Sequence, residues 1–362
     1  MRIDLKLEKP KGKVAAVGSG FIALDVIESE QGEHFATGGT CGNVLSILAW
    51  LGWQTYPVAR LGKDAAGDFI LDELADIGVD TTFVRQDVST PTPIVFQRNI
   101  VDRNGQRTHR FAMTCPGCGQ WLPRFRPIVR TDAERTKAEM AAKPALFFFD
   151  RVSPGILDLA RWARGEGAVV MFEPSSFSDD KAFRTAVELC HILKFSKERL
   201  GHVKDFGNAA YPAIVIETQG EHGLRIRWHD KWTNFDAFDA PRFVDAAGAG
   251  DWCSAGFLHM VSQRGSSGLA AASKGVVERA VRLGQALSAL NCGYEGATGL
   301  METLSVTSAS KLLRTLLGGK GELPETSENE TRSTKSLRLC ASCKPEKQPS
   351  SQIRLRGNSR GS

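Results

Sequence analysis

Short apolar segments alternate with amphipathic ones over the second half of the chain. The apolar segments predict buried strands at residues 145–150, 168–172, 189–193 and 213–217. Helical patterns fill the intervals between the first three, at residues 154–164 and 180–187. Strands that are apolar on both faces and alternate with helices are typical of a parallel sheet with helices on both sides. The pattern therefore predicts an α/β fold with a mostly parallel sheet.

The first half of the chain adds a strand at residues 14–17 and a helix at residues 44–51, followed by a pattern of a different kind. Two segments, residues 92–101 and 106–113, flank Asp102-Arg-Asn-Gly105, and an Asn-Gly pair between strands is typical of a β-hairpin. The apolar, β-branched segment at residues 21–27 is expected to join this hairpin in a small separate sheet. Further helices are predicted at residues 132–142, 252–261 and 269–290.

Charge is distributed unevenly along the chain. The net charge is +5, yet residues 331–362 alone hold eight Lys or Arg and a single acid, Glu346. From residue 318 onward the chain has almost no large apolar residues, so residues 318–362 are predicted to form a disordered basic tail. Such a tail is usually solvated, and nucleic-acid binding by it is not favoured.

Neither a signal-peptide core at the N-terminus nor an apolar segment of the roughly 20 residues needed to cross a bilayer is visible in the sequence. The eight cysteines are expected to be reduced thiols in a soluble cytoplasmic protein. Two C-x-x-C pairs, Cys115-Pro-Gly-Cys118 and Cys340-Ala-Ser-Cys343, are able to supply four thiolates to zinc. Their distance in the sequence and the lack of nearby His argue against a shared site.

The most informative motif is Asp245-Ala-Ala-Gly-Ala-Gly-Asp251, which leads directly into the predicted helix at residues 252–261. Its three small residues place no bulk beside the first helical turn, so backbone N–H groups there can converge on an anion, which the helix dipole also favours. Asp251 lies in that turn, where the dipole is expected to keep its carboxylate ionised and able to accept a proton. A phosphate site beside a base suits phosphoryl transfer to an alcohol. The plainer alternative is a glycine-rich turn capped by Asp245.

A second glycine-rich segment, Gly38-Gly39-Thr-Cys-Gly-Asn43, opens the predicted helix at residues 44–51. Glycines allow close approach of a ligand to the backbone, and the Asn43 amide offers both a donor and an acceptor. Asp25 lies on the otherwise apolar segment 21–27, so an ionised carboxylate there is either solvated or engaged by a ligand. These residues suit the binding of a polyol, although Asn43 is also a common type of helix cap.

The motif at residues 245–251 resembles the Asp-Thr-x-Gly-Ala-Gly-Asp signature of the ribokinase-like (PfkB) carbohydrate kinases, with Ala246 in place of the usual Thr. The segment from Asp25 to Gly67 resembles the family's first signature region, and Thr218-Gln-Gly-Glu-His-Gly223 resembles its nucleotide loop. One departure is Arg199, where an acid thought to organise Mg²⁺ and phosphate is often found. The resemblance covers roughly residues 13–300.

The resemblance implies a ribokinase-like three-layer α/β/α core over residues 1–317, with a small β-sheet lid at about residues 19–40 and 91–114. It implies an ATP-dependent transferase that phosphorylates a hydroxyl of a sugar, with ATP and Mg²⁺ as cofactors and, in some members, a monovalent cation. The site residues that it implies are catalytic Asp251, Gly248, Ala249 and Gly250; acceptor-binding Asp25, Gly38, Gly39 and Asn43; and nucleotide-binding Thr218, Gly220, Gly223, Asp245 and Asn291. A homodimer through the lid is a further expectation.

Three other functions stay open at this point. A nucleoside kinase of the same fold would share every motif, and a catalytically weak sugar-binding regulatory protein would retain the fold. A dehydrogenase would use Gly18-Ser-Gly20-Phe-Ile-Ala23, a G-x-G-x-x-A string. That string is interpreted as a decoy, because the segment after it has the pattern of a strand where dinucleotide binding requires a helix.

Overall fold

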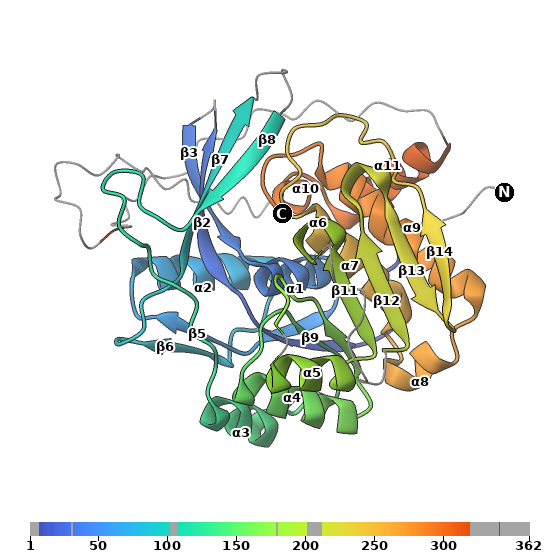
Figure 1. The fold of residues 1–362 in the computed structure, drawn as a ribbon, viewed down its shortest axis with the longest axis horizontal. Coiled ribbons are helices and arrows are strands. Elements are labelled where there is room, and N and C mark those ends of the chain that lie inside the picture. Colours follow the sequence, from blue (N-terminus) through green and yellow to red (C-terminus); the bar gives the residue numbers. More distant parts are fainter. Residues whose placement is uncertain are drawn as a thin grey trace, which may run out of the picture.

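The computed structural model describes residues 7–29, 32–101, 107–178, 180–200, 212–318 and residue 340. Its main sheet has eight strands (Figure 1). Their order across the sheet is β14 (Lys231–Phe235), β13 (Leu224–Trp228), β12 (Ile214–Thr218), β11 (Ile192–Ser196), β10 (Val169–Phe172), β9 (Pro144–Phe149), β1 (Ala15–Ser19) and β4 (Gln54–Pro57). The strands from β4 to β12 pair in parallel, and β13 and β14 extend one edge as antiparallel neighbours. The predicted mostly parallel α/β sheet is confirmed.

Alternation along the buried strands creates two separate hydrophobic cores. In β9, Leu146 and Phe148 face one core, whereas Phe147 and Phe149 face the other. The first core is completed by helices α1 (Thr40–Trp50), α7 (Ala249–Val261) and α9 (Lys274–Asn291), and the second by α4 (Pro154–Gly165) and α5 (Lys181–Leu189). Successive strand residues point to opposite faces, so a strand apolar at every position supports two helix layers at once. This gives the three-layer α/β/α arrangement.

A smaller sheet of four strands stands beside the main one (Figure 1). Its order is β3 (Gly32–Gly38), β2 (Ala23–Ser29), β7 (Ile94–Val101) and β8 (Arg107–Ala112). The pairing of β7 with β8 confirms the predicted hairpin, although its Asn-Gly turn lies outside the described residues. The strand β3 was not predicted, because its mixed polar sequence between glycines has the pattern of a loop.

The remaining elements pack around these two sheets. They are β5 (Ala59–Gly62) and β6 (Val84–Asp87), which form a two-stranded sheet, a 3-10 turn η1 (Gly220–His222), and helices α2 (Ala65–Ile77), α3 (Arg130–Glu139), α6 (Lys197–Leu200), α8 (Gly265–Ala270), α10 (Gly299–Thr303) and α11 (Val306–Gly318). The prediction of one helix over residues 269–290 is wrong, because the backbone leaves helical geometry at Ser273, between α8 and α9. Leu269 and Val277 enter the same core, so the apolar pattern continues across a break in the backbone.

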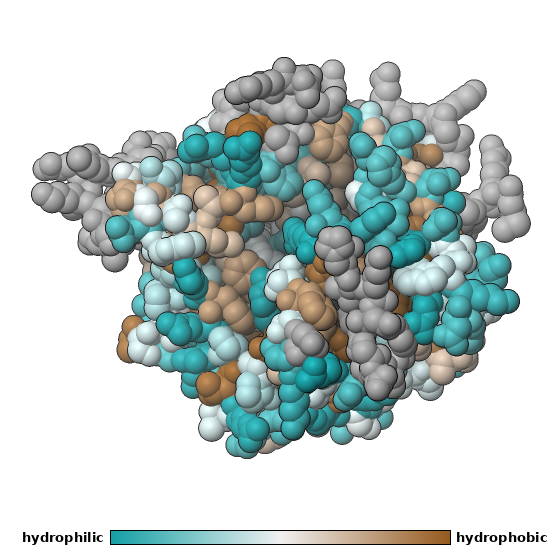
Figure 2. All heavy atoms as spheres, viewed as in Figure 1, coloured by the Kyte–Doolittle hydropathy of each residue, from teal (hydrophilic) through white to brown (hydrophobic). Residues whose placement is uncertain are grey.

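On the face shown in Figure 2, hydrophobic residues lie scattered among hydrophilic ones. Within the described ranges, no helix combines the length and the apolar character that a membrane span requires.

Candidate active site

Charged and polar residues gather where the parallel strands of the main sheet end. Asp150 follows β9, Glu173 follows β10, and Thr218 ends β12, while Lys194 lies in the middle of β11. The N-terminus of α7 meets the same edge, because the Lys194 Nζ donates to the carbonyl oxygen of Gly250 at 3.1 Å. Ligands of open α/β sheets bind outside the carboxyl ends of the strands, so this edge is the expected position of an active site.

The turn before α7 has the geometry of an anion site. Gly248 caps the helix with φ +71°, and a Cβ there would lie 2.5 Å from the Cα of Ala297, so this position requires glycine. Among the described residues, the N–H groups of Gly248 and Gly250 have no acceptor within the protein. The N–H of Ala249 donates to the carbonyl of Ala246 at 3.2 Å, so of the three predicted amides this one is already engaged.

Asp251 lies in the first turn of α7, and its Oδ2 accepts a 2.6 Å hydrogen bond from Nδ2 of Asn43 in α1. The prediction that the helix dipole keeps this carboxylate ionised is wrong. Burial, assisted by the charge of Glu173, raises the pKa of Asp251 to about 7, against the opposing effects of the Asn43 hydrogen bond and the Lys194 charge. A group with this pKa can both accept and release a proton near neutral pH, which suits a general base.

An ion pair between Lys194 and Glu173, which the sequence analysis did not predict, supports this turn. The Lys194 side chain is 2% exposed, and its Nζ donates to Glu173 Oε1. Burial alone would lower the pKa of Lys194, but the charge of Glu173 raises it above its usual value. Ser254 Oγ donates to Glu173 Oε2 at 2.5 Å and to the carbonyl of Gly250 at 3.1 Å. A charged lysine in the buried strand β11 was the available signal.

Asp150 is a second buried acid that the sequence did not single out. Its Oδ1 accepts from the backbone N–H of Phe21 at 2.8 Å, and its Oδ2 pairs with Arg151 at 2.8 Å. Burial outweighs these contacts and raises the pKa of Asp150 to about 6. A Cβ at Gly20 would lie 1.7 Å from Asp150 Oδ1. Gly20, directly after β1, therefore makes room for Asp150, and strand β2 follows where a dinucleotide site needs a helix.

The residues predicted to bind the acceptor come together beside Asp251. Asp25 in β2 packs against Gly38 in β3, where a Cβ would lie 1.9 Å from its Oδ2. Gly39 has φ +85° and caps α1, which carries Asn43. The Oδ1 of Asn43 is buried and has no hydrogen-bond partner among the described residues. This oxygen is therefore a buried hydrogen-bond acceptor that lacks a donor among the described residues.

The interpretation of Asp25 as an ionised carboxylate is also wrong for the free protein. Burial and the charges of Asp251 and Glu73 raise the pKa of Asp25 to about 8. The neighbouring charges come from separate elements, because β2, α2 and α7 bring Asp25, Glu73 and Asp251 together in one buried region. Near neutral pH the carboxyl group is mostly protonated until a ligand stabilises its charge.

The loop predicted to bind nucleotide lies one strand farther along the same edge. Thr218 Oγ1 donates to the carbonyl of Phe195 at 3.4 Å, which ties β12 to β11. Gly220 opens the turn η1, and Gly223 follows it with φ +88°; a Cβ there would lie 2.1 Å from the carbonyl oxygen of Phe235. The turn is therefore built closely against the antiparallel edge of the sheet.

Asp245 is held on all sides by protein groups. Its carboxylate accepts hydrogen bonds from the backbone N–H groups of Ala247 at 2.9 Å and Gly296 at 3.0 Å. It also binds Gln97 of β7 at 2.7 Å and His109 of β8 at 3.0 Å. These bonds outweigh the effect of burial and lower the pKa of Asp245. Its contacts link the small sheet to the turn before α7.

Asn291, at the end of α9, is likewise satisfied by the backbone. Its amide donates to the carbonyls of Ala247 and Gly296 at 3.1 and 3.3 Å and accepts from the N–H of Leu300 at 3.2 Å. A side chain with all these bonds positions the loop from residue 293 to residue 299 and leaves little capacity for a ligand. Asn291 shapes the site indirectly.

The sequence and the fold of the chain are both similar to those of known kinases. Residues 12–304 match the family described as "pfkB family carbohydrate kinase". The chain is 25% identical over 287 residues to a fructokinase of Klebsiella pneumoniae, covering 70% of this chain and 86% of that protein. The fold is similar to aminoimidazole riboside kinase from Salmonella enterica complexed with aminoimidazole riboside and an ATP analog, with TM-score 0.57, 20% identity and coverage of 83% and 99%. It is also similar to a Burkholderia thailandensis nucleoside kinase in complex with inosine, with TM-score 0.60, 18% identity and coverage of 84% and 97%.

Proposed function

The chain belongs to the pfkB family of carbohydrate kinases, and from this premise we propose how its residues transfer the γ-phosphoryl group of ATP to an alcohol. The chain is an ATP-dependent carbohydrate kinase. We assign the role of general base to Asp251. The observation that carries this assignment is its position in the first turn of α7, where its pKa is about 7. Beside it are the N–H groups of Gly248 and Gly250, which have no acceptor within the part of the chain that the structure describes.

In the proposed reaction, the acceptor hydroxyl oxygen forms a bond to the γ-phosphorus while the bond from that phosphorus to the β,γ-bridging oxygen breaks and ADP leaves. Asp251 takes the hydroxyl proton. The N–H groups of Gly248 and Gly250 donate to the oxygens of the transferring phosphoryl group, where negative charge is greatest. The pair formed by Lys194 and Glu173 keeps the carbonyl of Gly250, and with it the turn, in position.

We propose that Asp25, Asn43 and the backbone at Gly38 and Gly39 bind the acceptor. The buried Oδ1 of Asn43 has no donor among the described residues, and a sugar hydroxyl would supply one. Adjacent hydroxyls of the acceptor would donate to Asp25 and stabilise its ionised form. The small sheet, which carries Asp25, would act as a lid that excludes water as a competing phosphoryl acceptor.

The nucleotide is proposed to lie along the carboxyl edge from α7 toward the turn at Thr218, Gly220 and Gly223. In this arrangement Asp245 and Asn291 hold the loops that border the nucleotide. Mg²⁺ is proposed as the cofactor, since phosphoryl transfer requires neutralisation of phosphate charge. Among the described residues, no three carboxylates of this site have oxygens within 4.8 Å of one another, so Mg²⁺ would bind mainly phosphates and waters, with Glu173 or Asp150 as the protein carboxylate.

The acceptor class is open between sugars and nucleosides. The fructokinase relative favours a sugar, whereas the two structural neighbours are complexes with aminoimidazole riboside and inosine. All of these acceptors carry vicinal hydroxyls, which Asp25 and Asn43 would recognise. We therefore propose a sugar or a ribose-containing nucleoside as the substrate, used in the cytoplasm, where ATP is abundant.

A homodimer through the small sheet is also proposed. Phe111 of edge strand β8 and Met113 beyond it are 48% and 41% exposed, which is high for residues of this type. A second copy that paired with β8 would cover both side chains. Sedimentation of the protein as a monomer at micromolar concentration would contradict this proposal.

The deciding experiment measures ADP formation over a panel that includes fructose, ribose, inosine and aminoimidazole riboside, with Asp251→Asn as the negative control. We expect one class of acceptor to stimulate ADP formation in the wild type and not in the variant. A variant as active as the wild type would overturn the assignment of the base. Tight sugar binding without ADP formation in the wild type would instead support a regulatory protein, for which Ala246 and Arg199 are the relevant departures from the family pattern.

A further inference from the structure

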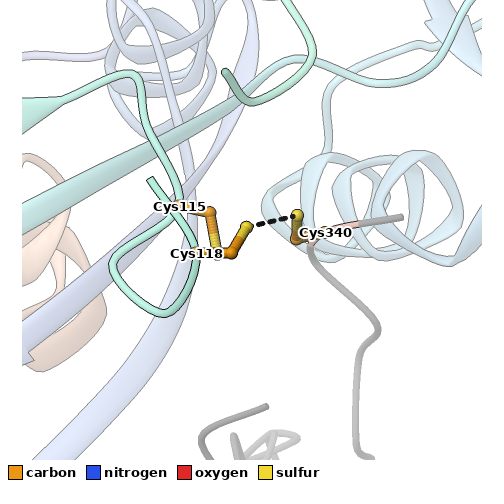
Figure 3. A group of neighbouring side chains, drawn as sticks. All are labelled: Cys115, Cys118 and Cys340. Carbon is orange, nitrogen blue, oxygen red and sulfur yellow. Dashed lines mark hydrogen bonds between the residues drawn. The ribbon is translucent and has the colours of Figure 1, made fainter. Parts of the chain in front are cut away.

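A cluster of three cysteines lies outside the kinase site. Cys115 and Cys118 belong to a turn after β8, and Cys340 comes from a part of the chain more than two hundred residues away. Their sulfur atoms all lie within 4.8 Å of one another, and the Sγ atoms of Cys118 and Cys340 are 3.6 Å apart (Figure 3). The separation in sequence argued against a shared site. Sequence alone does not show which distant segments come together in the folded chain.

We propose that Cys115, Cys118 and Cys340 are ligands of one structural zinc ion. Thiolates bind Zn²⁺ in a tetrahedron with Zn–S distances of about 2.3 Å, which places neighbouring sulfurs roughly 3.8 Å apart. The 3.6 Å between the Sγ atoms of Cys118 and Cys340 is close to this value, and the other pairs lie within 4.8 Å. Three soft sulfur ligands in one place favour zinc over magnesium or calcium, which prefer oxygen.

The turn from Cys115 to Gly119 is preformed for two ligands. The carbonyl of Cys115 accepts from the N–H of Gly119 at 2.8 Å, and the N–H of Cys115 donates to the carbonyl of Gln120 at 2.8 Å. Gly119 has φ +72°, which only glycine adopts readily. These bonds hold the two cysteines in one tight turn. In Figure 3 the Cys118 side chain points toward Cys340, and the Cys115 sulfur lies beside Cys118.

Burial supports a built site over a chance encounter of surface thiols. Cys115 and Cys340 are each 5% exposed and belong to the first hydrophobic core, whereas Cys118 is exposed. The exposed side allows an ion to enter, and the buried side excludes water from the metal. Zinc would replace the protons of the thiols, and the low-dielectric surroundings would strengthen its bonds to the thiolates.

A further cysteine follows Cys340 in the sequence. A C-x-x-C pair is the usual spacing of two zinc ligands, and Cys340-Ala-Ser-Cys343 repeats the spacing of Cys115-Pro-Gly-Cys118. Cys343 lies outside the described residues, so the proposed site consists of the three described cysteines.

The main alternative is a disulfide between Cys118 and Cys340. Their sulfurs lie well beyond the bonded distance of about 2.05 Å. A disulfide would involve only two of the three sulfurs, whereas a zinc ion would bind all three. The two possibilities differ in metal content and in mass under non-reducing conditions.

The position of the cluster gives the ion a structural role. The turn is framed by a bridge between Thr114 and Trp121 and by a 2.9 Å bond from the N–H of Leu122 to the carbonyl of Met113. The next segment reaches the small sheet, where the N–H of Ile94 at the start of β7 donates to Pro123. Zinc would fasten the C-terminal segment to the base of the small sheet.

The experiment measures zinc by elemental analysis in the full-length protein purified with reductant and without chelator. We expect about one zinc per chain in the wild type and in the control Cys190→Ser, whose thiol is buried elsewhere in the second core. Cys118→Ser and Cys340→Ser should lose most of the metal. A truncation after residue 339 should lose it, whereas a truncation after residue 345 should keep it.

A second measurement does not depend on folding of the variants. Alkylation of the wild type should spare Cys115, Cys118 and Cys340 until a strong chelator removes the metal, and peptide mass spectrometry identifies the modified residues. Chelator should also lower the Tm of the wild type but not that of Cys118→Ser. Metal-free wild-type protein, full zinc content in both Cys118→Ser and Cys340→Ser, iron in place of zinc, or a Cys118–Cys340 disulfide under reducing purification would each overturn the proposal.

Discussion

The hydrogen bond from Asn43 to Asp251 predicts a specific change in the pH dependence of the kinase. In Asn43→Ala the carboxylate loses a 2.6 Å charge-assisted bond that lowers its pKa. Hydrogen bonds to charged groups contribute about 1.5–3 kcal/mol, and one pKa unit corresponds to about 1.4 kcal/mol. The pKa of Asp251 should therefore rise by roughly 1–2 units above its value of about 7.

The sign follows from the base role. Only the ionised carboxylate accepts the proton, and at pH 7 its fraction should fall from about one half to between roughly one tenth and one hundredth. The variant should lose about 5- to 50-fold in kcat/KM at pH 7 and regain most of that loss as the pH rises past the new pKa.

The assay is kcat/KM against pH for the best acceptor in the panel, compared between wild type and variant. Because Asp25 also titrates near this range, the shift between the two profiles is the readout, not the absolute midpoint. Ser46→Ala, a buried change one turn farther along α1, is the matched control and should leave the profile in place. A uniform decrease at every pH would refute the reasoning, since it would mean that Asn43 contributes only an acceptor contact.

Three further predictions follow from individual contacts. Asp251→Asn should lower kcat by about 10²- to 10⁴-fold with nearly unchanged ATP affinity and Tm, and activity within a few-fold of wild type would contradict the base role. Asp25→Ala should weaken acceptor binding by about 1.5–3 kcal/mol in calorimetric titrations and spare ATP binding. Because the acceptor's hydroxyls would lower the raised pKa of Asp25, wild-type acceptor affinity should increase with pH up to about 8 and then level off, and a flat profile would exclude Asp25 as its anchor. Gly20→Ala should lower the stability in denaturant by about 1–3 kcal/mol, because the new Cβ overlaps Asp150, whereas Gly165→Ala, with open space around it, should not.

Much of the fold was predictable because its signals are local. The continuous apolar strands β9, β10 and β12 and the hairpin of β7 and β8 were found from the sequence. β11 begins three residues later than predicted, since Leu189 and Cys190 give an apolar pattern at the end of α5 that resembles the start of a strand. Propensity does not distinguish the buried end of a helix from a short buried strand.

The candidate site could be predicted where one segment contains both the anion-binding N–H groups and the proposed base, as in the turn from Gly248 to Asp251. It was not predictable where chemistry depends on contacts across the fold. The ionisation of Asp251 and Asp25 is set by burial among acids from separate elements, which no single motif records. The ion pair between Lys194 and Glu173 likewise joins residues of different segments, so no single motif predicts it.

The four hydrogen bonds to Asp245 have a thermodynamic consequence. One carboxylate joins β7 and β8 to the loop that leads into α7, so a displacement of either strand changes the surroundings of a residue six positions before Asp251. If the acceptor binds at the small sheet as proposed, linkage requires that the factor by which it alters ATP affinity equals the factor by which ATP alters acceptor affinity. We therefore expect substitutions of Gln97 and His109 to change the coupling free energy between the two proposed substrates.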